Sequence, residues 1–143
     1  MISEPWRGPD WPKNPPSNLQ QTTIDLPPPP SVNRIRRLNK TEMHFYARWL
    51  DACSRTVTKQ WADAKLRGTS RPSFGEAKVC VLVQLNEKMK LRDADNALKS
   101  CLDYLRRIEI IRDDSKQYVR RITVEWVEPA SAPEGARLTV VRL

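Results

Sequence analysis

Four aspartates in two short segments are the residues of this sequence best suited to chemistry. Asp93 and Asp95 lie two residues apart directly after a basic stretch, and Asp113 and Asp114 are adjacent, between an arginine and a lysine. Carboxylates repel phosphates, but a divalent cation can bridge carboxylate oxygens to a phosphate. Acids placed among so many cations therefore predict an Mg²⁺ site, with Mn²⁺ as the alternative metal.

Such a site predicts hydrolysis of phosphodiesters. A carboxylate-held metal activates a water molecule and stabilises the charge of the pentacovalent state. Lys99 lies four residues after Asp95, one helical turn along, where it could neutralise a phosphate oxygen or the leaving group.

Each acidic segment also has an explanation without a metal. Asp93 or Asp95 could cap a helix, Asp95 and Lys99 could form a surface ion pair, and Asp113-Asp114 has the composition of a turn. The second segment can approach the first only if the chain between them folds back along the helix. Spacing alone leaves this open.

The charge balance favours a polyanionic partner. The chain has 143 residues and a formal net charge of +8, and lysine and arginine gain affinity by releasing counterions from phosphates. We predict that two segments contact nucleic acid. The first segment contains Asn33, Arg34, Arg36 and Arg37, and the second contains Lys88, Lys90 and Arg92.

Several other classes of site and location are disfavoured. The three cysteines are scattered without a C-x-x-C pair or a histidine cluster, which argues against zinc and against a disulfide framework. We expect reduced cysteines and a cytoplasmic protein. No apolar run approaches the length of about 18 residues that a membrane span needs, and no glycine-rich loop predicts a small-molecule cofactor.

The hydrophobic pattern predicts an α+β fold with two layers, in which two main helices pack on a mixed sheet. We expect strands at 22–26, 77–85, 117–127 and 136–142, the last two forming a hairpin. A helix should begin at a capping box of Asn39 and Glu42 and stop at Gly68, and a second should span 95–106. Residues 1–20 form a Pro- and Trp-rich arm, and 21–143 form one domain.

Three segments, in order and in spacing, resemble the RusA-type Holliday-junction resolvases of phages and prophages. The sequence LPPPPSVNR at 26–34 is similar to the opening strand and Pro-Pro-Ser-x-Asn loop of that family. The sequence RDADNALK at 92–99 is similar to its D-x-D-N-x-x-K signature, and IRDDS at 111–115 to its acidic turn. The resemblance covers roughly residues 22–127.

The resemblance implies a RusA-like fold and a symmetric homodimer with two metal sites. Such a dimer would resolve a four-way DNA junction by paired nicks, in a bacterial or phage-infected cell. It implies Asp93, Asp95 and Asp114 as catalytic metal ligands, Asp113 as their neighbour and Lys99 as the catalytic lysine. The chain departs from the family in two places. Residues 106–109 contain no glycine before the acidic turn, and Lys116 precedes the glutamine at 117.

Two functions of other classes fit the same sequence. One is a non-catalytic DNA-architectural or RNA-binding module whose acids are structural. The other is a protein-interaction subunit that uses its Pro-rich arm as a docking ligand. A nuclease differs from both in cutting DNA when Mg²⁺ is added.

Overall fold

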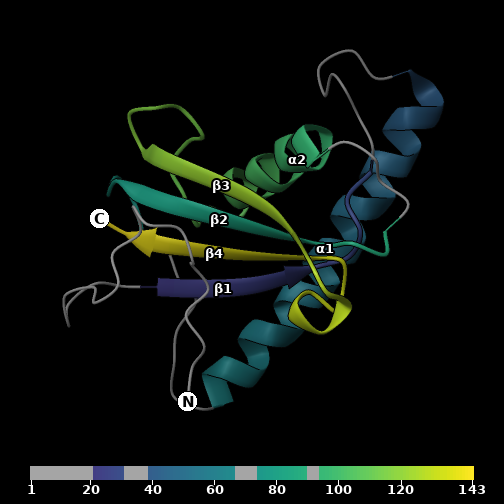
Figure 1. Cartoon of the computed structure of the whole chain (residues 1–143), viewed down its shortest axis with the longest axis horizontal. Coiled ribbons are helices and arrows are strands. Elements are labelled where there is room, and N and C mark those ends of the chain that lie inside the picture. The colour runs from purple at the N-terminus through teal and green to yellow at the C-terminus, as the bar shows by residue number, and fades with distance from the viewer. Residues whose placement is uncertain (1–20, 31–38, 67–73, 90–93) are drawn as a thin grey trace.

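The computed structural model describes residues 21–30, 39–66, 74–89 and 94–143, and Figure 1 shows how their elements are arranged. The elements follow one another as β1 (Gln21–Leu26), α1 (Lys40–Leu66), β2 (Val79–Asn86), α2 (Ala94–Arg107), β3 (Val119–Val127), the short 3-10 helix η2 (Pro129–Ser131) and β4 (Ala136–Arg142). The expected α+β class, its mixed sheet and the order of its strands and two main helices are confirmed.

The four strands form one sheet in the order β1-β4-β2-β3. The pair β2 and β3 is parallel, whereas β4 is antiparallel to both β1 and β2. The expected hairpin of the last two strands is therefore wrong. Residues Leu138 to Val141 of β4 are buried on both faces, which suits an interior strand, whereas β3 keeps exposed side chains and lies at the edge.

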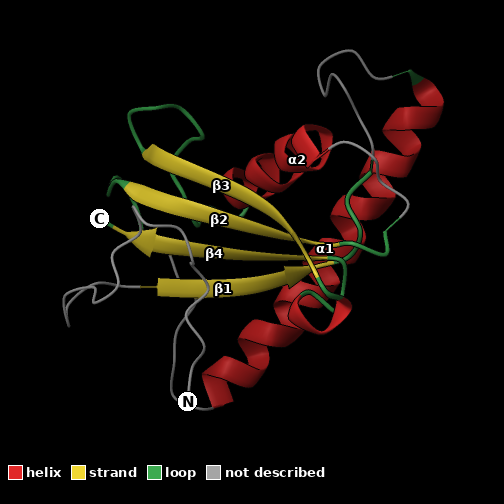
Figure 2. Ribbon diagram, viewed as in Figure 1, coloured by secondary structure: helices red, strands yellow, loops and turns green. Residues whose placement is uncertain are grey.

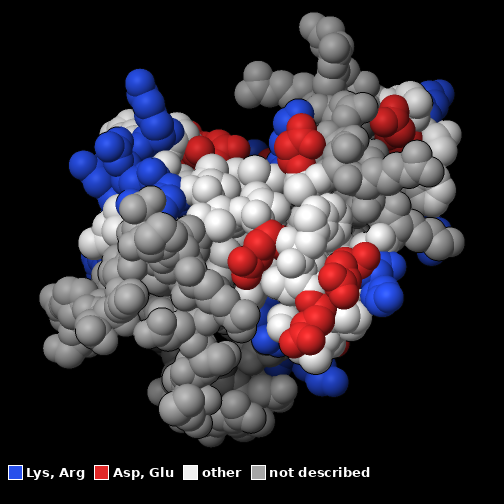
Figure 3. Space-filling view, viewed as in Figure 1, with Lys and Arg blue, Asp and Glu red and all other residues white. Residues whose placement is uncertain are grey.

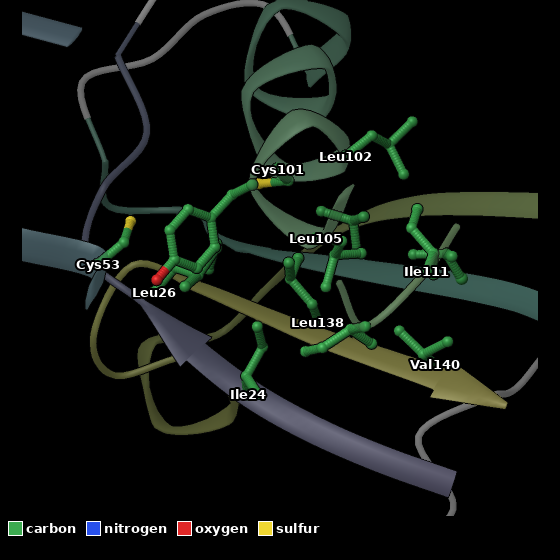
Figure 4. Close-up of a cluster of buried hydrophobic side chains, with 14 of the residues drawn as sticks. Ile24, Leu26, Cys53, Cys101, Leu102, Leu105, Ile111, Leu138 and Val140 are labelled. Atoms are coloured by element: carbon green, nitrogen blue, oxygen red, sulfur yellow. The ribbon is translucent and has the colours of Figure 1, made fainter. Parts of the chain in front are cut away.

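Both helices cover the same face of the sheet, so the domain has two layers (Figure 2). The core lies between these layers. Figure 4 shows Leu102 and Leu105 of α2 in one cluster with Ile24 of β1 and Leu138 of β4. All four belong to the main cluster of buried hydrophobic residues. The helices are held to the sheet by this apolar contact.

The first helix begins where the capping box predicts. The Glu42 backbone N–H donates to Asn39 Oδ1 at 2.8 Å, and the Asn39 backbone N–H donates to Glu42 Oε1 at 3.3 Å. Further along, Gln60 pairs with the edge strand β1. Its side-chain amide accepts from the Asp25 N–H at 3.1 Å and donates to the Asp25 carbonyl at 2.9 Å. This pairing satisfies backbone groups that an edge strand leaves open.

The face of the sheet opposite the helices carries a second, small buried cluster of Cys80, Leu82 and Val141. Strand β2 is thus buried on both faces, not only on the side of its valines. Cys53, Cys80 and Cys101 are all free and buried, as expected for reduced core residues. Burial raises the pKa of each thiol, which makes all three poor nucleophiles. Among the described helices, none has the length and apolar character needed to span a bilayer.

Candidate metal and nucleic-acid site

The structure describes some of the predicted site residues and not others. Asp95, Lys99, Asp113, Asp114 and Lys88 are described. The remaining predicted residues lie outside the described parts of the chain; they are Asn33, Arg34, Arg36, Arg37, Lys90, Arg92 and Asp93.

Asp95 lies in the first turn of α2. Its side chain is exposed and forms no hydrogen bond or ion pair with the rest of the described chain. Carboxylates are favoured at this end of a helix by the partial positive charge of the free N–H groups. Lys99, also exposed, follows one turn later on the same face. Asp95 is therefore available to an external cation.

The acidic turn begins where α2 ends, and Glu109 makes the reversal. Its φ of 62° is the left-handed conformation that usually requires glycine. The Glu109 N–H donates to the Arg106 carbonyl at 3.1 Å, and the Ile110 N–H donates to the Leu105 carbonyl at 3.0 Å. These two bonds define a Schellman motif with glutamate at the glycine position. The connection without glycine, noted in the sequence, is thus made at the expense of backbone strain.

Asp113 and Asp114 are adjacent in the turn, and Asp113 perturbs the ionisation of Asp114. Partial burial is the largest cause that raises the pKa of Asp114, although the side chain remains mostly exposed, and the hydrogen bond and negative charge of Asp113 raise it further. The charge of Arg106 opposes this shift. Two adjacent carboxyl groups of this kind favour either a shared proton or a bound cation.

The helix α2 separates the two acidic segments. Arg106, which interacts electrostatically with Asp114, stands 106 − 95 = 11 residues after Asp95. At 1.5 Å per residue, this is about 16 Å of helix axis. Figure 1 likewise shows the turn before β3 at the opposite end of α2 from its start. Within the described residues, no three acidic, histidine or cysteine side chains form a group able to hold a metal.

Asp103, a residue that the motifs did not single out for a role, is the most heavily bonded carboxylate described. It is 8% exposed and accepts from Tyr46 Oη at 2.5 Å, from Arg106 Nη2 at 2.7 Å and from Arg107 Nε at 2.7 Å. Burial alone would raise the pKa of Asp103, but these hydrogen bonds outweigh burial and hold it below the ordinary value. The network joins α1 to the end of α2 from which the acidic turn departs.

The signal for Asp103 was present in the sequence, because it lies on the same helix as Asp95 and is followed at three and four residues by arginines. What the sequence does not give is Tyr46, which is 57 residues away in α1.

Lys88 is the one residue of the two predicted nucleic-acid-binding segments that the structure describes. It lies in the turn after β2, its side chain is exposed, and its backbone N–H donates to Asn86 Oδ1 at 2.8 Å. The Asn86 side chain is fixed in turn by donating to the Ala132 carbonyl at 3.1 Å. The turn therefore presents Lys88 to solvent on an ordered support.

No protein-family model and no curated protein matches this chain.

Proposed function

We propose that the protein is a metal-dependent endonuclease that acts as a homodimer on four-way DNA junctions. The observation that carries the proposal is the presence of an acidic segment at each end of α2 in a chain with a net charge of +8. A strongly cationic protein gathers phosphates, and exposed carboxylates on it are best explained by a cation that brings the two together.

A metal shared by both acidic segments requires a second copy of the chain. Metal-bound oxygens lie about 2.1 Å from Mg²⁺, so ligands separated by most of the length of α2 cannot meet on one ion. A two-fold axis that sets α2 antiparallel to the same helix of the partner would bring Asp95 of one copy toward the partner's Asp114. Because the axis is two-fold, the same contact forms twice and gives two equal sites.

The charges at the two ends of α2 support this pairing. Asp95 is in the first turn, and Arg106 and Arg107 are in the last. Antiparallel helices would place Asp95 of each beside these two arginines of the other, which pair with Asp103 of their own chain but remain about half exposed. The helix dipoles would oppose one another favourably. The two-site dimer matches the two strands that must be nicked to resolve a junction.

The residues fit the chemistry of Mg²⁺, because all proposed ligands are carboxylates. When bound, the metal would activate water and stabilise the charge on phosphorus. The chain contributes Asp95 and Asp114, with Asp93 and Asp113 beside them, as ligands. Lys99, exposed one turn from Asp95, would neutralise a phosphate oxygen. The basic segments would hold the junction arms.

A specific observation favours a second candidate, a nucleic-acid-binding module without catalysis. The described residues of one copy do not by themselves form a metal-binding group, and an acid at a helix start or in a turn can be structural. This candidate predicts binding to DNA and no cutting.

Cleavage of a synthetic junction separates the two. Purified protein is incubated with an end-labelled four-way junction and with a linear duplex, with Mg²⁺ and with EDTA. The proposal expects symmetric nicks in the junction alone and only with Mg²⁺, and their loss in Asp95→Asn and Asp114→Asn. Asp51→Asn, an exposed acid on α1, is the matched control and should cut normally. Binding to the junction without nicks in Mg²⁺ would establish the non-catalytic module instead.

A further inference from the structure

The end of the sheet at which β2 and β3 begin carries a group of cations that the predicted phosphate-binding segments do not include. We call it the strand-end cluster, and it consists of Lys78, Lys116, Arg120 and Arg142. Figure 3 shows lysine and arginine side chains gathered on the surface where β3 begins, at the upper left, with acidic side chains beside them.

The backbone pairing places these cations close together. Val79 pairs with Val119 of β3 on one side and with Arg142 of β4 on the other. The Leu143 N–H donates to the Lys78 carbonyl at 2.8 Å. Neighbouring strands are about 4.8 Å apart, so the backbone positions of Lys78, Arg120 and Arg142 lie within about two strand spacings, about 10 Å.

A β-bulge adds Arg120 to this group. Val79 pairs with Val119 and Cys80 with Arg121, so Arg120 is an extra residue in β3. A β-bulge interrupts the regular alternation of side chains between the two faces of a strand, and so changes the direction in which a side chain points. Arg120 Nη1 donates to the Lys116 carbonyl at 3.1 Å, which ties the arginine to the turn that also contains Asp113 and Asp114.

The cluster is not neutralised within the described chain. The ion pairs there join Arg55 to Asp51, Arg106 and Arg107 to Asp103, and Arg137 to Asp25. None of them involves Lys78, Lys116, Arg120 or Arg142. Lys78, Lys116 and Arg120 are exposed. These cations lie at strand ends and on a turn that a hydrogen bond holds in place, and the described residues give them no acidic partner. They are therefore available to bind an external anion.

We propose that the strand-end cluster binds the phosphodiester backbone of duplex DNA, beside the Asp113-Asp114 turn. The inference rests on the proposed function only in taking DNA as the ligand, and it does not depend on cutting. A row of phosphates matches several cations spread over about 10 Å, because each contact releases counterions and contributes without base recognition.

The test measures DNA binding in EDTA, so that no cutting intervenes. The variant Lys78→Ala/Lys116→Ala/Arg120→Ala is compared with Arg48→Ala/Arg55→Ala/Lys59→Ala, which removes three exposed cations from α1 and changes the net charge equally. Fluorescence anisotropy with a labelled duplex gives Kd across a salt series. A second version of the cluster variant, with glutamine at the three positions, keeps longer polar side chains if the alanine version folds poorly.

Loss of three phosphate contacts should lower the slope of log Kd against log salt by about 2.7, at about 0.9 per contact on B-DNA. At low salt the cluster variant should bind at least about tenfold more weakly than the α1 variant, whose slope should change by less than one contact. Equal slopes for the two folded variants would overturn the inference. Wild type that binds with the full slope but never nicks would overturn the nuclease and leave the cluster in place.

Discussion

Replacing Asp103 by asparagine should destabilise the fold far more than the same replacement at Asp51. Both aspartates stand four residues before an arginine on a helix, and both form an ion pair with it. They differ in burial, because the Asp51 side chain is 68% exposed and the Asp103 side chain 11%. The pair of variants therefore compares the same chemical change at a buried carboxylate that accepts three hydrogen bonds and at an exposed one with a single ion pair.

The magnitude follows from the three hydrogen bonds of Asp103. The bond from the buried Tyr46 hydroxyl to a carboxylate contributes about 1.5–3 kcal/mol. The two arginines are 46% and 49% exposed, and solvent screens their bonds to at most about 1 kcal/mol together. Asparagine keeps one weaker acceptor for Tyr46 and turns an N–H group toward the arginines. We expect Asp103→Asn to lower the free energy of unfolding by about 2 kcal/mol, whereas Asp51→Asn should change it by no more than about 0.5 kcal/mol.

Urea unfolding followed by circular dichroism measures both variants, and it should be repeated as a function of pH. The pKa of Asp103 is held below its ordinary value, so its contribution to stability is complete above that value and is lost as the pH falls through the folded-state pKa. The difference between wild type and Asp103→Asn should accordingly shrink below about pH 4. Equal stability of Asp103→Asn and Asp51→Asn at neutral pH would refute the reasoning.

Three further substitutions test local geometry by thermal unfolding. Glu109→Gly should stabilise the protein by about 1 kcal/mol, because glycine adopts the left-handed φ of 62° without strain, and a lower Tm would contradict the Schellman cap. Gly135→Ala should destabilise it by about 2–4 kcal/mol, because φ is +137° and the added Cβ would lie 2.6 Å from the Pro28 nitrogen; an unchanged Tm would show that the loop can move. Ser100→Ala should be neutral or stabilising by up to about 1 kcal/mol, since its buried Oγ has no hydrogen-bond partner in the described residues, and a clear loss would reveal a hidden partner.

The elements of the fold could be predicted because their signals are local. The Asn39–Glu42 capping box fixes the start of α1, and the alternation of valines in β2 identifies a buried strand. The pairing of the strands is not local. The expected hairpin failed because nothing in the short connection records that β4 must fill the space between β1 and β2. Strand β4 is buried on both faces because it lies between β1 and β2.

For the candidate site, too, the local features could be predicted from the sequence and the long-range arrangement could not. The acids could be singled out because each segment sets two carboxylates close together beside basic residues, and the sequence left open whether the chain folds back. The left-handed Glu109 does reverse the chain, but the acidic turn stays near Arg106, at the far end of α2 from Asp95. The distance along a helix could have been computed from the spacing. The position of the turn could not, because it depends on Ile110 packing into the core.

Mixing two inactive variants tests the shared metal site most directly. Asp95→Asn and Asp114→Asn proteins are unfolded together, refolded and assayed for Mg²⁺-dependent nicking of a labelled junction. If each site takes Asp95 from one copy and Asp114 from its partner, a mixed dimer has one intact site, and random mixing restores nicking to about a quarter of the wild-type sites. If mixed dimers form and no nicking returns while wild type treated identically cuts, the acids do not combine across copies, and the proposed site is wrong.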